Sequence, residues 1–167
     1  MTEEELLEEC ISNFPTIFKD ALVNKPKIKE KFIKNVSKEY KELPVYRALC
    51  YENSIIDEDF RSYNELALLR KEEGKLDTLE WYSVSVNEDR EQLINVLDIP
   101  NEERKILGIA KGMMQCEFGP ADFVGKKTHH NWYLYDGVIS SLKEQFKIEP
   151  ILAEKGDNYD ERFGILE

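Results

Sequence analysis

The segment from Ile106 to Gly137 constrains the fold of this chain more than any other part of the sequence. In ILGIAKGMMQCEFGPADFVGKKTHHNWYLYDG, an apolar run is followed by a Gly/Pro loop, the only two histidines of the chain and an aromatic run. Apolar, β-branched and aromatic runs separated by Gly and Pro are typical of successive strands. We therefore predict strands at Lys105 to Glu117 and His130 to Tyr135, with a loop of roughly ten residues between them. We expect a functional site to include residues of this segment.

The rest of the chain divides into a helical first quarter and a part rich in strands. Apolar residues recur at helical spacing in three successive segments up to about Leu43, and the second and third begin at Pro15 and Pro26. After Pro44 the pattern changes to short apolar runs that alternate with helical stretches. We expect further strands at 44–50, 79–86 and 146–152, and helices at 87–97 and 138–145.

This order of elements predicts an α+β protein. N-terminal helices would pack on a mostly antiparallel, twisted sheet of about 4–6 strands. The 167 residues suit a single domain that can bury its own core. Within it, 1–43 would form a helical N-terminal layer, 44–152 the strand-rich part and 153–167 a polar tail.

The charge balance narrows the classes of partner. Lys and Arg number 23 and Asp and Glu number 34, which gives a net charge of −11. Such a field repels nucleic-acid phosphates and anionic lipid, and it favours a partner with a basic surface. We therefore expect a protein partner and no direct nucleic-acid binding. The one basic cluster, Lys25 to Lys41, is either a solvated helix face or an anion-binding face.

Cysteines and hydropathy predict a cytoplasmic protein. The three cysteines, Cys10, Cys50 and Cys116, are widely spaced, so neither a disulfide framework nor a zinc site is indicated. The acidic N-terminus does not resemble a signal peptide, and no run approaches the ~18 apolar residues of a membrane helix. We expect no membrane association, and the sequence does not define the oligomeric state.

The adjacent histidines are candidates for chemistry. Neighbouring residues of a strand point to opposite faces, so His129 and His130 cannot share one metal ion, and no metal site is expected. His130 is a candidate ligand-binding residue, although a structural role for both histidines stays open. Cys116 with His130 and either Asp122 or Asp136 could be written as a nucleophile triad, but a triad is defined by geometry and nothing beyond residue type supports one here. The favoured interpretation of Cys116 is a small buried hydrophobic residue. The glycines match no phosphate-binding loop.

Three short motifs carry a resemblance to an enzyme family. Arg47 stands alone in an apolar strand, Ser83 and Ser85 flank a valine in an aromatic strand, and Gln115 and Glu117 end a third strand. In this order they resemble the Arg–Ser–Glu class of ADP-ribosyltransferases, although valine replaces the family's middle threonine. The resemblance implies that Arg47 binds the phosphates of NAD, that Ser83 and Ser85 orient the nicotinamide, and that Glu117 is catalytic with help from Gln115. An arginine fork matches phosphate, and a carboxylate can stabilise an oxocarbenium-like centre.

A second, broader resemblance covers Leu43 to Phe146. The order YRAL, YSVS, IAKG, CEFGP and HxNWYLYDG is similar to a family of small uncharacterised proteins of Gram-positive bacteria and their phages. It implies a small cytoplasmic accessory protein without established chemistry. Our first hypothesis is therefore an acidic, cofactor-free protein of phage or mobile-element type. It would bind and inhibit a host macromolecule, such as a defence or nucleic-acid enzyme. Trp132 is a candidate anchor of the interface. The alternative is an ADP-ribosyltransferase-like enzyme that uses NAD.

Overall fold

The computed structural model describes residues 3–71, 78–97, 108–123 and 128–150. Within these ranges, seven strands form one sheet in which every neighbouring pair is antiparallel. The strands are β1 (Val36–Ser37), β2 (Leu43–Leu49), β3 (Val84–Asn87), β4 (Gly108–Met114), β5 (Ala121–Asp122), β6 (His129–Trp132) and β7 (Lys147–Glu149). Their order across the sheet is β1-β5-β6-β3-β2-β4-β7. The α+β class is confirmed, and the strand count is above the expected range.

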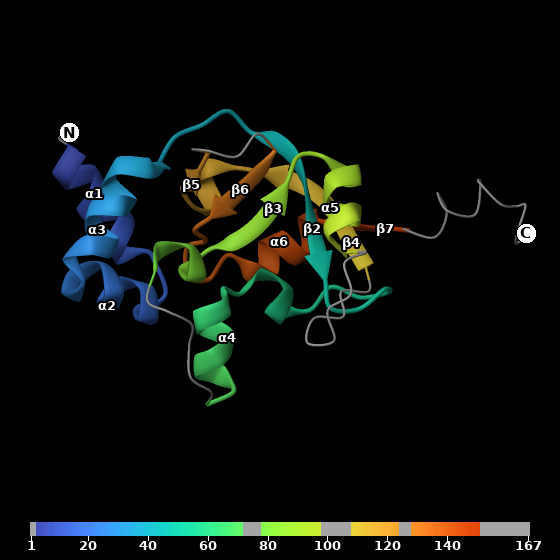
Figure 1. Cartoon of the computed structure of the whole chain (residues 1–167), viewed down its shortest axis with the longest axis horizontal. Helices are drawn as coiled ribbons and strands as arrows, with labels where there is room; N and C mark the ends of the chain where they lie inside the picture. Colours follow the sequence, from blue (N-terminus) through green and yellow to red (C-terminus); the bar gives the residue numbers. More distant parts are fainter. Residues whose placement is uncertain (1–2, 72–77, 98–107, 124–127, 151–167) are drawn as a thin grey trace, which may run out of the picture.

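Helices lie at one end of the sheet and against its faces. The α-helices are α1 (Glu3–Ser12), α2 (Thr16–Asn24), α3 (Pro26–Asn35), α4 (Tyr63–Leu69), α5 (Arg90–Leu97) and α6 (Ile139–Gln145). The 3-10 helices are η1 (Asp57–Phe60), η2 (Leu79–Tyr82) and η3 (Cys116–Phe118). Figure 1 shows α1, α2 and α3 together at one end, α6 behind the strands and α4 projecting from the lower side. No described helix has the length and apolar character needed to cross a membrane.

The third helix is shorter than the sequence predicts. Pro26 occupies its first turn, and Ile28 and Phe32 are buried one helical turn apart. The prediction that it continues to about Leu43 is wrong, because the chain becomes extended at Val36 and forms β1. Val36 pairs with Asp122 of β5, so a β-branched residue completes the edge of the sheet instead of another helical turn.

The core consists of two clusters, and the aromatic run that begins at Trp132, the last residue of β6, joins them. Trp132 belongs to the cluster between the sheet, η1 and α6, together with Phe60 and Phe146. Its neighbour Tyr133 belongs to the cluster under α2 and α3, where its ring centroid lies 5.5 Å from that of Phe18. Since side chains alternate along an extended chain, consecutive residues reach both clusters.

Two predicted strands differ from the observed elements. The segment 79–86 begins as η2, since Leu79 and Tyr82 pack into the helical cluster, and only β3 is a strand. The strand predicted from His130 to Tyr135 starts at His129 and ends as a ladder at Trp132. Beyond Trp132 the chain still donates backbone hydrogen bonds, from Tyr133 and Tyr135 to the loop that follows β4. Residues 105–107 and 151–167 lie outside the described ranges. The predicted start of the strand at Lys105, the end of the last strand and the polar tail therefore cannot be compared with the structure.

Candidate functional site

A buried carboxylate closes the loop that follows β2. Asp59 is 1% exposed and belongs to η1. Its Oδ1 accepts a hydrogen bond from the backbone N–H of Cys50 at 2.8 Å, and its Oδ2 accepts one from that of Ile56, also at 2.8 Å. These two amides are the first and last of residues 50–56, which we call the 50–56 loop. A charged acceptor makes stronger hydrogen bonds than a neutral one, so Asp59 fixes both ends of this loop.

Arg47 reinforces the same closure from β2. Its Nε donates to the carbonyl oxygen of Asp59 at 2.6 Å, and its Nη1 donates to the carbonyl oxygen of Ser85 at 3.0 Å. The guanidinium therefore ties η1 to β2 and β3 through backbone carbonyls. We call Arg47 and Asp59 together the loop clamp.

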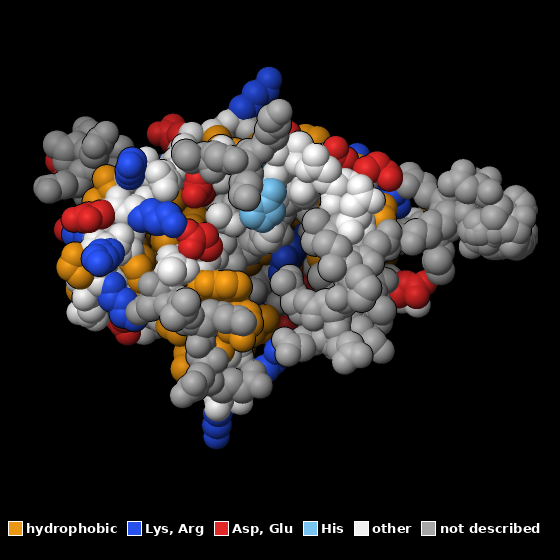
Figure 2. All heavy atoms as spheres, in the orientation of Figure 1, with side chains coloured by type: hydrophobic (Ala, Val, Ile, Leu, Met, Phe, Trp, Pro, Cys, Tyr) orange, Lys and Arg blue, Asp and Glu red, His pale blue; other side chains and the backbone are white. Residues whose placement is uncertain are grey.

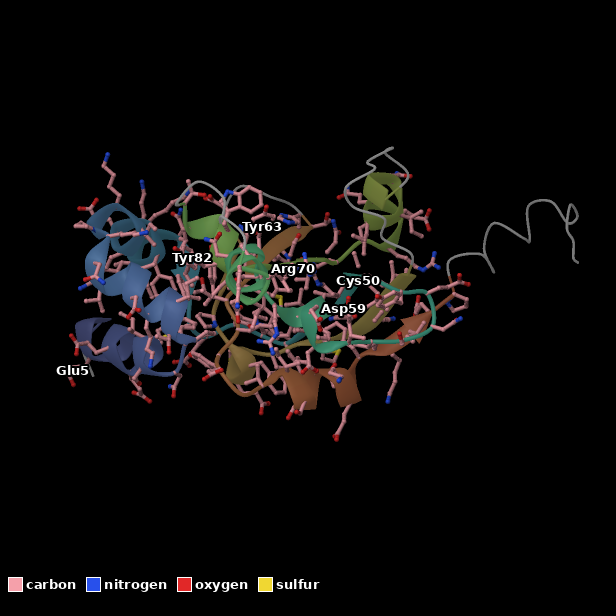
Figure 3. All side chains as sticks on the ribbon, turned by 90° about the horizontal axis from the view of Figure 1, so that it is seen from below. Glu5, Cys50, Asp59, Tyr63, Arg70 and Tyr82 are labelled. Carbon is pink, nitrogen blue, oxygen red and sulfur yellow. The ribbon has the colours of Figure 1, made fainter. Side chains whose placement is uncertain are left out.

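The thiol beside the clamp is held in its protonated form. Burial raises the pKa of Cys50 above its usual value, and the neighbouring Asp59 carboxylate acts in the same direction. Arg47 and Arg70 oppose the rise only in part. Because the thiolate is the nucleophile, this arrangement does not activate Cys50. Figure 3 shows Cys50 next to Asp59, with Arg70 close by.

The 50–56 loop presents an aromatic ring among carboxylates. Tyr51 is 53% exposed, and Glu52 is exposed beside it. Asp57 and Glu58, directly after the loop, are also exposed. The first residue of β4, Gly108, lies so close that a Cβ there would be 2.7 Å from the Tyr51 carbonyl oxygen. The loop is thus held at its base by the clamp and along its backbone by β4.

Arg47 and Ser85, expected to share an NAD site, leave the sheet on opposite faces. Tyr46 pairs with Asn87 across β2 and β3, and paired residues share a face. Ser85, two residues before Asn87, lies on that face, whereas Arg47 alternates to the other. On its own face Arg47 lies between the buried core residues Val45 and Leu49. The structure joins Arg47 to the Ser85 backbone and does not bring the two side chains together.

The other residues of the expected NAD site have separate surroundings. The Oγ of Ser83 donates to the carbonyl oxygen of Glu80 at 2.7 Å. Gln115 donates to the Glu42 carboxylate at 2.8 Å. Glu117 is exposed on η3 after β4, and β4 borders β2 on the side away from β3. Ser83 and Gln115 thus contact different parts of the chain.

The two histidines point to opposite faces of β6 and have different partners. His129 forms a hydrogen bond through its Nε2 to the Oγ of Ser85 on the neighbouring strand. His130 is 3% exposed, its Nε2 lies 2.5 Å from a Glu88 carboxylate oxygen, and its ring packs on Phe123. The Nδ1 of His130 is buried without a hydrogen-bond partner among the described residues. Within the same ranges, no three His, Cys, Asp or Glu side chains are grouped to hold a metal ion.

Trp132 is a core residue in this structure. Its side chain is fully buried, and its Nε1 donates to the Gly119 carbonyl oxygen at 3.1 Å. A partner could contact this ring only after local unfolding, so its large apolar surface stabilises the fold.

Sequence reasoning did not single out Asp59 or Glu88, and it did not foresee the contact between His129 and Ser85. Asp59 is one of three acids in the run Asp-Glu-Asp, and nothing in the sequence distinguishes the one that turns inward. His129 meets Ser85 through a register between strands that are 44 residues apart in sequence.

Comparisons with protein-family models, curated proteins and solved structures find no match for this chain. The two sequence resemblances therefore stay predictions. The function has to be argued from the residues themselves.

Proposed function

We propose that the protein acts by binding a protein partner with a basic surface, and that the 50–56 loop is part of the interface. In this proposal it is an accessory protein of phage or mobile-element type that inhibits a host macromolecule by occupying it. The supporting observation is the loop clamp, which holds an exposed tyrosine and its neighbouring carboxylates in one conformation.

A fixed loop favours binding for an entropic reason. Ordering a free loop upon association lowers the affinity, and a loop that is already ordered avoids this loss. Tyrosine is enriched among the residues that dominate binding energy, because it offers a large rigid surface with a polar end. Tyr51, with Glu52 and Glu58 nearby, suits a partner whose surface combines an apolar pocket with lysine or arginine.

The charge and the cysteines agree with this setting. A net charge of −11 accelerates association with a basic partner and discourages self-association. Cys10, Cys50 and Cys116 are all unpaired, which suits a reducing cytoplasm.

The test is a capture experiment with matched charge variants. The loop variant carries Tyr51→Ser, Glu52→Lys and Glu58→Lys, and the control carries Glu8→Lys and Glu144→Lys on exposed helix positions. Each tagged protein is incubated with host extract, and captured proteins are quantified by mass spectrometry. Any basic protein captured by the wild type and the control is then purified for calorimetry.

The proposal expects one basic protein to bind the wild type and the control equally. The loop variant should bind it at least about 30-fold more weakly, as expected for the loss of an interface anchor of about 2 kcal/mol. If the loop variant captures the same proteins in the same amounts, or no captured protein binds after purification, the loop is not the interface.

An NAD-dependent transferase is the second candidate. The observation in its favour is that β2 and β3, the strands of Arg47 and Ser85, are neighbours in the sheet. It predicts that NAD raises the melting temperature and that Glu117→Gln abolishes hydrolysis or transfer. An unchanged melting temperature at millimolar NAD would eliminate it.

A further inference from the structure

Lysines gather on the helical end of a protein that is otherwise acidic. Between Lys19 and Lys41 the sequence has eight lysines and three acidic residues, against a net charge of −11 for the whole chain. Figure 2 shows basic side chains over the end formed by α1, α2 and α3, with acidic side chains among them. The loop proposed as an interface does not involve this surface.

Helix α3 separates a buried face from a basic one. Ile28 and Phe32 pack into the core, whereas Lys27, Lys29 and Lys34 are exposed. Lys27 and Lys34 are seven residues apart and thus lie along one flank of the helix. Lys29 lies on the other flank, and the only acidic residue of α3, Glu30, lies between the flanks.

Three of the four exposed lysines of α3 form no ion pair within the described residues of the fold. The exception is Lys31, which pairs with Glu80 of η2. Lys27, Lys29 and Lys34 make no ion pair or side-chain hydrogen bond within the described part of the chain. Three ammonium groups on one short helix repel one another, which makes an external anion favourable.

Exposed apolar side chains accompany the lysines. Ile33 on α3 is 49% exposed, and it follows Lys29 by one helical turn. Val23, at the end of α2, is 70% exposed. We call Lys27, Lys29, Lys34, Ile33 and Val23 the lysine face. A partner that matches it needs carboxylates together with apolar side chains.

The residue types favour an acidic peptide over nucleic acid. No arginine precedes Arg47 in the sequence, although arginine is the residue whose planar fork matches phosphate. The acidic remainder of the protein repels a long polyanion at every point along its length, whereas a short segment can remain on α3. Phosphates also offer nothing to Ile33 or Val23.

We propose that the lysine face binds an acidic, amphipathic segment of a partner protein. Carboxylates of the segment pair with Lys27, Lys29 and Lys34, and its apolar side chains cover Ile33 and Val23. This site is independent of the 50–56 loop and carries the opposite charge.

Fluorescence anisotropy tests the proposal with the full chain. The probe is a labelled short peptide of repeated Glu-Glu-Leu, and the comparison ligands are a Glu-Glu-Ser peptide, a single-stranded oligodeoxynucleotide and phosphatidylserine vesicles. The face variant is Lys27→Glu, Lys29→Glu and Lys34→Glu. The matched control, Lys71→Glu, Lys111→Glu and Lys147→Glu, changes three exposed lysines elsewhere by the same total charge.

The Glu-Glu-Leu peptide should bind the wild type and the control. It should bind the face variant at least about tenfold more weakly, and Ile33→Ser should weaken it about threefold. Raising the salt from about 50 to about 300 mM should weaken binding to the wild type, because exposed pairs are screened. The proposal is overturned if the wild type does not bind the peptide, if the control loses as much affinity as the face variant, or if the serine peptide, the oligonucleotide or the vesicles bind as tightly. The 50–56 loop variant should bind normally, which separates this result from the proposed function.

Discussion

Removing the Asp59 carboxylate should release the 50–56 loop and lower the stability of the whole domain. The residue is 1% exposed and accepts two backbone hydrogen bonds, each 2.8 Å long. A hydrogen bond to a charged group contributes about 1.5–3 kcal/mol, so Asp59→Ala should reduce the free energy of unfolding by about 3–5 kcal/mol. For a chain of this size, that corresponds to a fall in Tm of about 10 °C.

Asp59→Asn should cause a smaller loss. The amide retains one acceptor oxygen, and its NH2 group faces the second backbone N–H, so about half of the effect is expected. The matched control is Asp57→Asn, two residues earlier. Asp57 pairs with Lys143 at 2.8 Å on the surface, and removing such an exposed pair should leave the stability almost unchanged.

Urea denaturation gives the global value and hydrogen exchange gives the local one. In Asp59→Ala, the amides of Cys50 and Ile56 should lose protection before the rest of the sheet, because they lose their acceptors directly. The clamp argument fails if Asp59→Ala unfolds within about 1 kcal/mol of the wild type, or if these two amides exchange as slowly as before.

Three further predictions follow from single contacts. Burial raises the pKa of Glu65, so the folded state loses stability as the pH rises above about 4.3, where the unfolded chain ionises first. Glu65→Gln keeps an acceptor for the Ser62 amide and should flatten this loss, as measured by urea denaturation at several pH values. Gly119→Ala should lower the free energy of unfolding by at least about 2 kcal/mol, because φ is 150° and a Cβ would lie 2.9 Å from the Leu134 Cα. Gly137→Ala, with φ 84° and open space around it, should lower it by about 1 kcal/mol, and thermal unfolding measures both. Arg47→Lys cannot serve both carbonyls and should lower the unfolding free energy by about 1–3 kcal/mol, and equal stability would contradict its role in the clamp.

Local patterns predicted the class of this fold well. The spacing of Ile28 and Phe32 indicated the buried face of α3, and Pro26 marked its first turn. The apolar run after Pro44 forms most of β2. In the aromatic run after His129, successive side chains point to opposite sides, and Trp132 and Tyr133 therefore lie in different core clusters. In each case the signal is a local pattern of residue types along the chain, which a single sequence displays.

The candidate site was harder to predict because its contacts are non-local. Arg47 stands out in the sequence as a charge within an apolar run, and it does lie in β2. Its partners are backbone carbonyl oxygens, which any residue type can supply, so the sequence does not reveal them. Ser85 was expected to orient a nicotinamide together with Ser83, and the register of β3 and β6 instead places it beside His129. A shift of one residue along a strand exchanges the faces, and a single sequence does not determine that register.

The placement of Arg47 argues for display of the loop rather than catalysis. Binding the phosphates of NAD would require the guanidinium donors that now serve the carbonyls of Asp59 and Ser85, and those carbonyls would lose a charged donor. The same bonds support a binding role without any rearrangement, because they keep Tyr51 and its acidic neighbours in place. Salt separates the two kinds of interaction. The clamp is centred on the buried Asp59 carboxylate and is little screened, whereas contacts of the loop and of the lysine face are exposed. If capture by either surface falls with salt while the melting temperature does not, the loss belongs to the surfaces and the scaffold beneath them is intact.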